Sequence, residues 1–132
     1  MNTHETYVSL EVAKLLKQAG FDWKCRKCYN NGVLFDMESD EIREQCPQHS
    51  SYDVLAPTLD VAQRWLREVK KYHIYVRPYS LDDETYVTNI VVTDSIWGAL
   101  QDDSKKAIIF NTYEEALEAG IKTCLRIILK EE

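Results

Sequence analysis

The sequence predicts an α+β protein in which three helices pack on a mostly antiparallel sheet of about four to five strands. Three segments place apolar residues at helical spacing, others alternate apolar with polar residues, and short turns join the alternating segments. A chain of 132 residues is long enough to bury about two thirds of the surface of its unfolded form. We therefore expect a single domain over residues 1–132.

The first helix is expected over residues 9–19. Ser9 is a suitable N-cap, and Leu10, Ala13 and Leu16 follow at helical spacing. Gly20 is suited to the left-handed position that ends a helix.

Residues 21–35 alternate aromatic and polar side chains around Asn30-Asn31-Gly32, which predicts a β-hairpin. Residues 38–53 are polar and charged with little periodicity, and we expect a long loop there or a short helix near residues 40–45.

The second helix is expected to begin at Thr58, because Pro57 favours an extended entry and Thr58 can cap the first turn. Its apolar stripe has the spacing i, i+3, i+7 and i+10, and consists of Leu59, Ala62, Leu66 and Val69. Trp65 broadens this stripe and is interpreted as a core residue.

Residues 73–79 and 85–93 read as an antiparallel hairpin, since both runs are rich in β-branched and aromatic residues. Residues 94–106 are expected to be a loop with some extended structure, and residues 107–110 a short apolar strand that rejoins the sheet.

The last helix opens with a capping box formed by Thr112 and Glu115. Its apolar face consists of Ala116, Leu117, Ile121, Cys124, Leu125 and Ile128. Gly120 lies inside the helix, which indicates close approach of another element at that point.

Charge and segment composition exclude several classes of protein. The formal net charge is −6, and residues 72–132 hold nearly all of the excess, with 6 basic and 11 acidic side chains. This distribution disfavours duplex nucleic acid as a partner. No secretion signal and no run of about 18 apolar residues is visible, so we expect a cytoplasmic protein without membrane contact, whose cysteines are reduced thiols or metal ligands.

One constellation carries a specific chemistry. Cys25 and Cys28, then Cys46 and His49, form two pairs with a two-residue spacing, as in many tetrahedral zinc sites. Free thiols and redox or disulfide use are the alternatives, because a strand would point Cys25 and Cys28 to opposite faces. Four protein ligands leave no open position for catalysis, so any zinc would be structural. Cys124 is interpreted as a small buried hydrophobe.

Two short basic clusters are candidates for contact with an anion or a partner, and solvated surface is their simpler interpretation. The candidate contact residues are Lys24, Arg26, Lys27, Arg64, Arg67 and Lys71. The acidic groups at residues 82–84 and 102–103 are expected to be solvated rather than to bind a cation. Neither a phosphate-binding glycine loop nor a hydrolase or metalloprotease motif is present, so we predict no catalytic or cofactor-binding residues.

Several stretches together resemble a group of uncharacterised small proteins encoded in prophages and other mobile elements of gut anaerobic bacteria. The resemblance rests on Ala56-Pro57-Thr58-Leu59, on Trp65-Leu66-Arg67-Glu68, on residues 113–121, and on the opening and the strand at residues 7–21 and 73–79. It spans most of the chain, does not include the cysteine and histidine quartet, and implies no particular activity.

The first functional hypothesis is therefore a non-enzymatic accessory protein of a prophage or mobile element that acts through protein contacts. Its eight tyrosines and three tryptophans would supply aromatic anchors. The alternative is a small zinc-stabilised module with nucleic-acid contact through the basic clusters.

Overall fold

The fold is taken from a computed structural model, which describes residues 6–30, 32–36, 53–92, 95–101 and 106–131. The described helices are α1 (Leu10–Gln18), α3 (Leu59–Trp65) with its π-helical continuation η1 (Leu66–Lys70), and α4 (Tyr113–Glu131). The strands are β1 (Lys27–Asn30), β2 (Val33–Asp36), β3 (Asp53–Leu55), β4 (Tyr72–Ser80), β5 (Thr85–Val92) and β6 (Ser95–Ala99).

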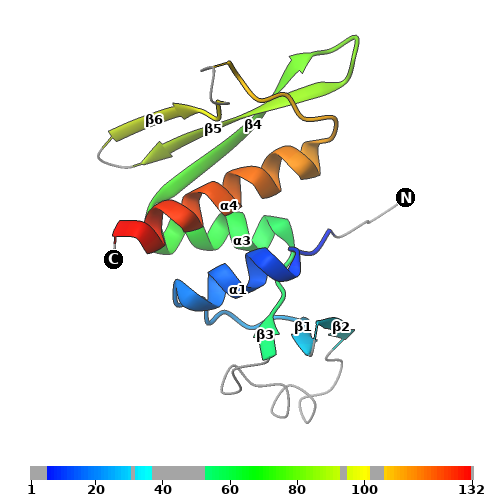
Figure 1. The fold of residues 1–132 in the computed structure, drawn as a ribbon, viewed down its shortest axis with the longest axis vertical. Helices are drawn as coiled ribbons and strands as arrows, with labels where there is room; N and C mark the ends of the chain where they lie inside the picture. Colours follow the sequence, from blue (N-terminus) through cyan, green and yellow to red (C-terminus); the bar gives the residue numbers. More distant parts are fainter. Residues whose placement is uncertain (1–5, 31, 37–52, 93–94, 102–105, 132) are drawn as a thin grey trace.

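The α+β class is confirmed, but the strands form two sheets where the sequence predicted one. In the described residues, one sheet has the order β2-β1-β3 and the other β4-β5-β6, and every strand pair is antiparallel. The helices lie between the two sheets (Figure 1). Strand β3 pairs with β1 across a long stretch of chain, a contact that local periodicity does not encode.

Helix α1 begins and ends where its caps predict. The Ser9 side chain accepts a hydrogen bond from the amide of Val12, and Gly20 has a φ of 98°. The α1 residues Val12, Ala13 and Leu16 are buried, so the helix contributes one apolar stripe to the core.

The second predicted helix is confirmed at its start and differs at its end. Thr58 accepts from the amide of Val61, and Trp65 is buried in the core. The chain then widens into the π-helix η1, which ends at Lys71 in the left-handed conformation with a φ of 64°. The wider turns rotate Val69 outward, and its 48% exposure shows that its prediction as part of the apolar stripe was wrong.

Strands β4 and β5 form the predicted hairpin, and α4 covers one face of it. Thr112 accepts from the amide of Glu115, as the capping box requires. A methyl group added at Gly120 would lie 2.8 Å from a side-chain carbon of Ile74 and of Thr88. The predicted close approach at Gly120 is therefore confirmed.

Thr88 on β5 also holds α4 close to the sheet at this point. It is fully buried, and its hydroxyl donates to the carbonyl oxygen of Ala116 at 2.7 Å. A buried hydroxyl without a partner would oppose folding, so this hydrogen bond ties β5 to one turn of α4.

The predicted loop at residues 94–106 includes β6, in agreement with the extended structure expected there. Residues 107–110 make only isolated bridges, from Ala107 to Gln101 and from Phe110 to Tyr86. The expected loop at residues 38–53 falls almost wholly outside the described residues. Among the described helices, none has the length and apolar run needed to cross a membrane.

Candidate functional site

The predicted zinc ligands are only partly described. Cys25 is a buried free thiol, whereas Cys28 is buried and disulfide-bonded, so the expectation of reduced thiols or metal ligands is wrong at Cys28. Cys46 and His49 lie outside the described residues. Within the described ranges, His, Cys, Asp and Glu side chains form no group of three that could hold a metal ion.

Cys25 has the properties of a structural thiol. Its Sγ donates to the carbonyl oxygen of Trp23 at 3.4 Å, and burial raises the pKa of the thiol to about 12. Zinc binds the thiolate form of cysteine, and disulfide exchange also proceeds through the thiolate. Neither Cys25 nor Cys28 offers a thiolate in this structure, so the zinc set stays a prediction.

Cys124 is buried on the inner face of α4, as predicted. Burial raises the pKa of this thiol to about 12 as well. It is a core side chain and not a candidate nucleophile.

The structure places Arg64 of the second basic cluster against the residue that precedes the first. The guanidinium of Arg64, on α3, lies 5.8 Å from the ring centre of Trp23, the residue before Lys24. Lys27 is held separately, with its Nζ 4.5 Å from the ring centre of Tyr7. These are cation–π contacts, each worth about 0.5–1 kcal/mol at an exposed site.

Part of the positive charge on α3 and η1 is already neutralised. Glu68 forms an ion pair with Arg64, and its backbone carbonyl accepts from the Nζ of Lys71. Arg67 is exposed. The basic side chains therefore do not form one continuous positive surface, because the acidic residue Glu68 lies among them.

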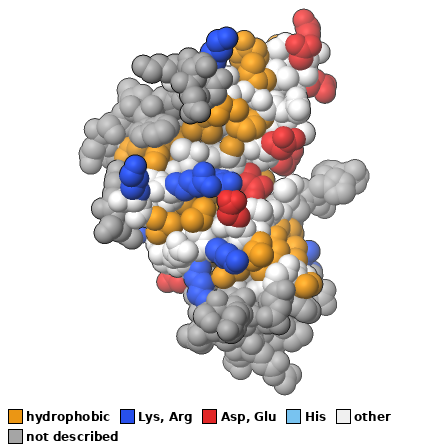
Figure 2. Space-filling model, viewed as in Figure 1, with side chains coloured by type: hydrophobic (Ala, Val, Ile, Leu, Met, Phe, Trp, Pro, Cys, Tyr) orange, Lys and Arg blue, Asp and Glu red, His pale blue; other side chains and the backbone are white. Residues whose placement is uncertain are grey.

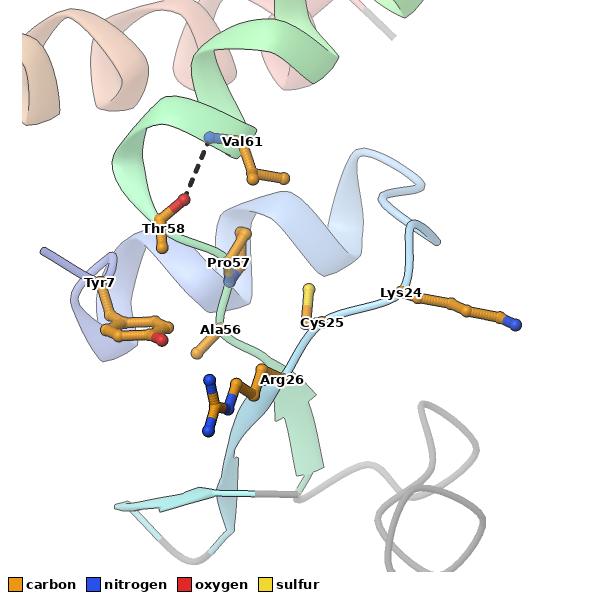
Figure 3. Close-up of a pocket in the computed structure, with 8 residues that line it drawn as sticks. All are labelled: Tyr7, Lys24, Cys25, Arg26, Ala56, Pro57, Thr58 and Val61. Atoms are coloured by element: carbon orange, nitrogen blue, oxygen red, sulfur yellow. Dashed lines mark hydrogen bonds between the residues drawn. The ribbon is translucent and has the colours of Figure 1, made fainter. Parts of the chain in front are cut away.

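A pocket of about 190 Å³ lies beside the first cluster, where residues 24–26 meet the start of α3. Tyr7 and Arg26 extend into the same space, whereas Lys24 points away and the Cys25 sulfur is directed toward Pro57 (Figure 3). The Thr58 hydroxyl is already used as the helix cap. The Cys25 thiol is buried and protonated. The residues that line the pocket therefore include no activated thiol nucleophile.

A second surface was not predicted from the sequence. Ile74 and Thr88 face Gly120 of α4, so the alternate positions Tyr75 and Arg77 lie on the opposite side of the sheet. The cross-strand hydrogen bond from the Nε of Arg77 to the Oδ1 of Asn89, 3.0 Å long, lies on that side. Asn89 is the β5 partner of Tyr75.

Three large apolar or aromatic side chains are exposed along β4 and the turn that follows, where the register with β5 shifts between Pro78 and Ser80. Tyr75 is 55% exposed, Tyr79 59% and Leu81 82%. We call the surface formed by Tyr75, Arg77, Tyr79 and Leu81 the open face. The signal in the sequence was the alternation in residues 73–79, in which aromatic residues occupy the outward positions.

The turn after β4 is acidic. Asp82, Asp83 and Glu84 are all exposed, as predicted, and the amide of Asp83 donates to the hydroxyl of Ser80. At the end of the molecule where this turn lies, Asp and Glu side chains adjoin hydrophobic ones (Figure 2). The other predicted acidic pair, Asp102 and Asp103, lies outside the described residues.

Comparison with known proteins gives no further assignment. No protein-family model, curated protein or solved structure matches the chain. The resemblance to small proteins of mobile elements stays a prediction.

Proposed function

We propose that this chain is a non-enzymatic protein that works through protein–protein contacts, and that the open face is its contact surface. The observation that carries the proposal is the exposure of Tyr75, Tyr79 and Leu81 along one strand and its turn. Tyrosine supplies a large contact area and a hydroxyl for little loss of side-chain entropy, which is why it recurs at interaction hot spots.

The scaffold behind this surface supports the same proposal. Strand β4 pairs with β5 along nearly its whole length, and α4 packs on the inner side at Ile74. A surface that is already ordered loses little conformational freedom on binding. The described pocket offers no activated group, which also favours binding over catalysis.

Photo-crosslinking in the native cell tests the proposal. A benzoylphenylalanine placed at Tyr79 is expected to crosslink one defined protein, and Leu81→Asp in the same chain should remove that product. The matched control is the same probe at Lys14, which is exposed on α1. Equal crosslinking from both positions, or none from Tyr79, would overturn the proposal.

The proposal includes a cytoplasmic location and an origin in a mobile element. The disulfide of Cys28 argues against a cytoplasmic location, because disulfides persist mainly in oxidising compartments, and its redox state in cells therefore tests this part of the proposal. Alkylation of lysed native cells followed by mass spectrometry should find Cys28 reduced if the protein is cytoplasmic. Full oxidation of Cys28 in those cells would contradict this part of the proposal.

A second candidate function is a zinc-stabilised module that contacts single-stranded nucleic acid. It is favoured by the contact of Arg64 with Trp23, because basic residues beside aromatic rings are typical of such surfaces. Fluorescence anisotropy with a labelled oligonucleotide should show binding that weakens with salt and with Arg64→Gln. Absence of binding at low salt, together with a melting temperature unchanged by EDTA, would exclude this candidate.

A further inference from the structure

We infer that the pocket beside Arg26 binds a small phosphate monoester, an organic phosphate in which an apolar group adjoins the phosphate. This site goes beyond the proposed function, because the pocket lies next to strands β1 and β3, whereas the turn of the open face lies at the far end of the β4–β5 hairpin (Figure 1). The inference is based on the fixed position of the pocket walls, on the charge of the side chains around the pocket, and on its size.

Backbone hydrogen bonds hold the segments that form the pocket walls. Two of them, 2.9 and 3.0 Å long, join residues 6–8 to residues 57–59 and so keep Tyr7 beside the start of α3. The amide of Ala56 donates to the carbonyl oxygen of the residue after Arg26 at 2.9 Å. The pocket is therefore formed before a ligand enters, and a preformed site loses little conformational freedom on binding.

Positive charge predominates around the pocket. Among the described residues that line it, Lys24 and Arg26 are cations and none is Asp or Glu. The Nζ of Lys27 lies 4.5 Å from the ring centre of Tyr7, which forms another wall of the pocket. In a chain with a formal net charge of −6, this local excess of positive charge attracts an anion to the pocket.

The side chains that extend into the pocket suit a phosphate group. Figure 3 shows the phenol of Tyr7 and the guanidinium of Arg26 directed into the same space, whereas the Lys24 side chain points away. A guanidinium presents several N–H donors in a planar fork, so it can hold two phosphate oxygens in addition to its other contacts. The Tyr7 hydroxyl can donate to a third oxygen.

The number of cations favours a phosphate over a carboxylate. A phosphate monoester carries a charge of about −1.5 to −2 at pH 7, and Arg26 and Lys27 together supply two positive charges at this site. A carboxylate would leave one of them without compensation. The ligand that matches the charge of the site is therefore a dianion.

The rest of the pocket is apolar and small. Ala56, Pro57 and Val61 line it, and its volume is about 190 Å³. Sites that enclose a whole drug-sized ligand measure about 300–1,000 Å³, so this pocket accepts a phosphate and the few atoms next to it. Because the apolar walls gain contact only from carbon atoms, an organic phosphate should bind more tightly than inorganic phosphate.

A titration of the full chain, followed by NMR at constant ionic strength, tests the inference with phenyl phosphate as the probe. Phenyl phosphate should shift the amide signals of residues 24–27 and of the start of α3, and leave those of residues 75–81 unchanged. It should bind about tenfold more tightly than inorganic phosphate, which lacks the apolar ring, and than benzoate, which carries one charge. Shifts spread evenly over the molecule, or equal affinity for the three anions, would overturn the inference.

Two matched variants separate the pocket from general attraction by positive charge. Arg26→Gln and Lys24→Gln remove the same charge from neighbouring positions, but only the Arg26 side chain extends into the pocket. Arg26→Gln should weaken the binding of phenyl phosphate at least about tenfold, and Lys24→Gln less than about twofold. Equal weakening would overturn the inference. Tyr7→Phe, which keeps the ring below Lys27, should weaken binding about threefold.

The unmodified chain provides a readout that does not depend on the folding of a variant. Nuclear Overhauser effects are expected between the phenyl protons of the probe and the methyl groups of Val61, and their absence at saturation would overturn the inference. Thermal melting of each variant controls for misfolding. Tighter binding of a short 5′-phosphorylated oligonucleotide than of phenyl phosphate would assign the pocket to nucleic acid and overturn the small ligand.

The outcome for the pocket is independent of the proposed function. Leu81→Asp, which disrupts the open face, should leave the binding of phenyl phosphate unchanged. Failure of phenyl phosphate to bind would overturn the inference, while crosslinking from Tyr79 would still decide the role of the open face.

Discussion

The two sheets of this protein are stabilised in different ways. The sheet of β4, β5 and β6 buries one face against α4, where Ile90 and Thr88 are fully enclosed. The sheet of β1, β2 and β3 has strands of three or four residues, and Val33 on β2 is 56% exposed. The small sheet buries fewer apolar side chains, with Cys28 and Val54 as the buried residues among its described positions, and it therefore depends more on individual bonds.

The bonds of the small sheet can be named. The Tyr29 hydroxyl donates to the carbonyl oxygen of Val8, the amide of Ala56 donates to that of Lys27, and Cys28 is disulfide-bonded. Each net hydrogen bond contributes about 1 kcal/mol. The comparison teaches that the small sheet can open locally at a modest cost, whereas the large sheet opens only with the whole protein.

The largest expected effect is at the centre of the large sheet. Ile90→Ala should lower the free energy of unfolding by about 2–5 kcal/mol, because it leaves a cavity under α4. Leu34→Ala on β2, where the side chain is already partly exposed, should cost less than about 1 kcal/mol. Urea unfolding of both variants measures this difference, and equal losses would contradict it.

A smaller loss is expected from Gly120→Ala. The added methyl group meets side-chain carbons of Ile74 and Thr88, and such overpacking costs about 1–3 kcal/mol. Better helix propensity returns up to about 1 kcal/mol of this. An increase in the denaturation midpoint would show that α4 does not approach the sheet this closely. Lys14→Ala compared with Lys14→Gly, at an exposed position within α1, controls for propensity alone.

Tyr29→Phe tests the small sheet at a single bond. Loss of the hydrogen bond to Val8 should cost about 1 kcal/mol and increase amide exchange in β1 and β2. Exchange in β4 and β5 should stay unchanged. Faster exchange in both sheets would mean that they open as one unit.

The smallest expected effect is a loss of stability at alkaline pH. Burial raises the pKa of Cys25 and Cys124 to about 12 in the folded protein, whereas unfolded thiols ionise near their ordinary value of about 8.5. Unfolding therefore releases protons as the pH rises toward that value, and stability should fall by about 0.8 kcal/mol between pH 7 and 8.5.

Denaturant midpoints across this pH range measure the loss. The double variant Cys25→Ala, Cys124→Ala should show a flatter profile, although its stability at pH 7 will be lower. Rapid reaction of either thiol with iodoacetamide in the folded protein at pH 8 would contradict their burial.

Features set by neighbouring residues could be predicted from the sequence. The caps at Ser9, Thr58 and Thr112, the left-handed Gly20 and the close approach at Gly120 all follow from the chemistry of one or a few adjacent positions. Each of these features depends on residues that are close together in the sequence, so the residue types alone predict it.

Features that depend on distant pairing could not be predicted. The pairing of β3 with β1 divides the strands into two sheets, and the contact of Arg64 with Trp23 joins segments about 40 residues apart. Val69 was misplaced because a period of 3.6 residues was assumed through a stretch that forms π-helical turns. The sequence shows the open face only as an alternation of residue types in β4. Which set of residues points outward depends on where α4 packs, and the sequence does not give that position.

The π-helical segment η1 also bears on changes of chain length. A π-helical turn holds one residue more than an α-helical turn needs, and such turns fit an insertion into a helix without disturbing its flanks. Deletion of a single residue from Leu66–Lys70 would let the segment continue as an α-helix, with the Val69 side chain returned toward the core. Strand β4 would resist the accompanying rotation, because its register with β5 and the packing of Ile74 on Gly120 hold its inward side in place. The extra residue of η1 therefore lets the helix and the strand that follows it keep their own rotational phases.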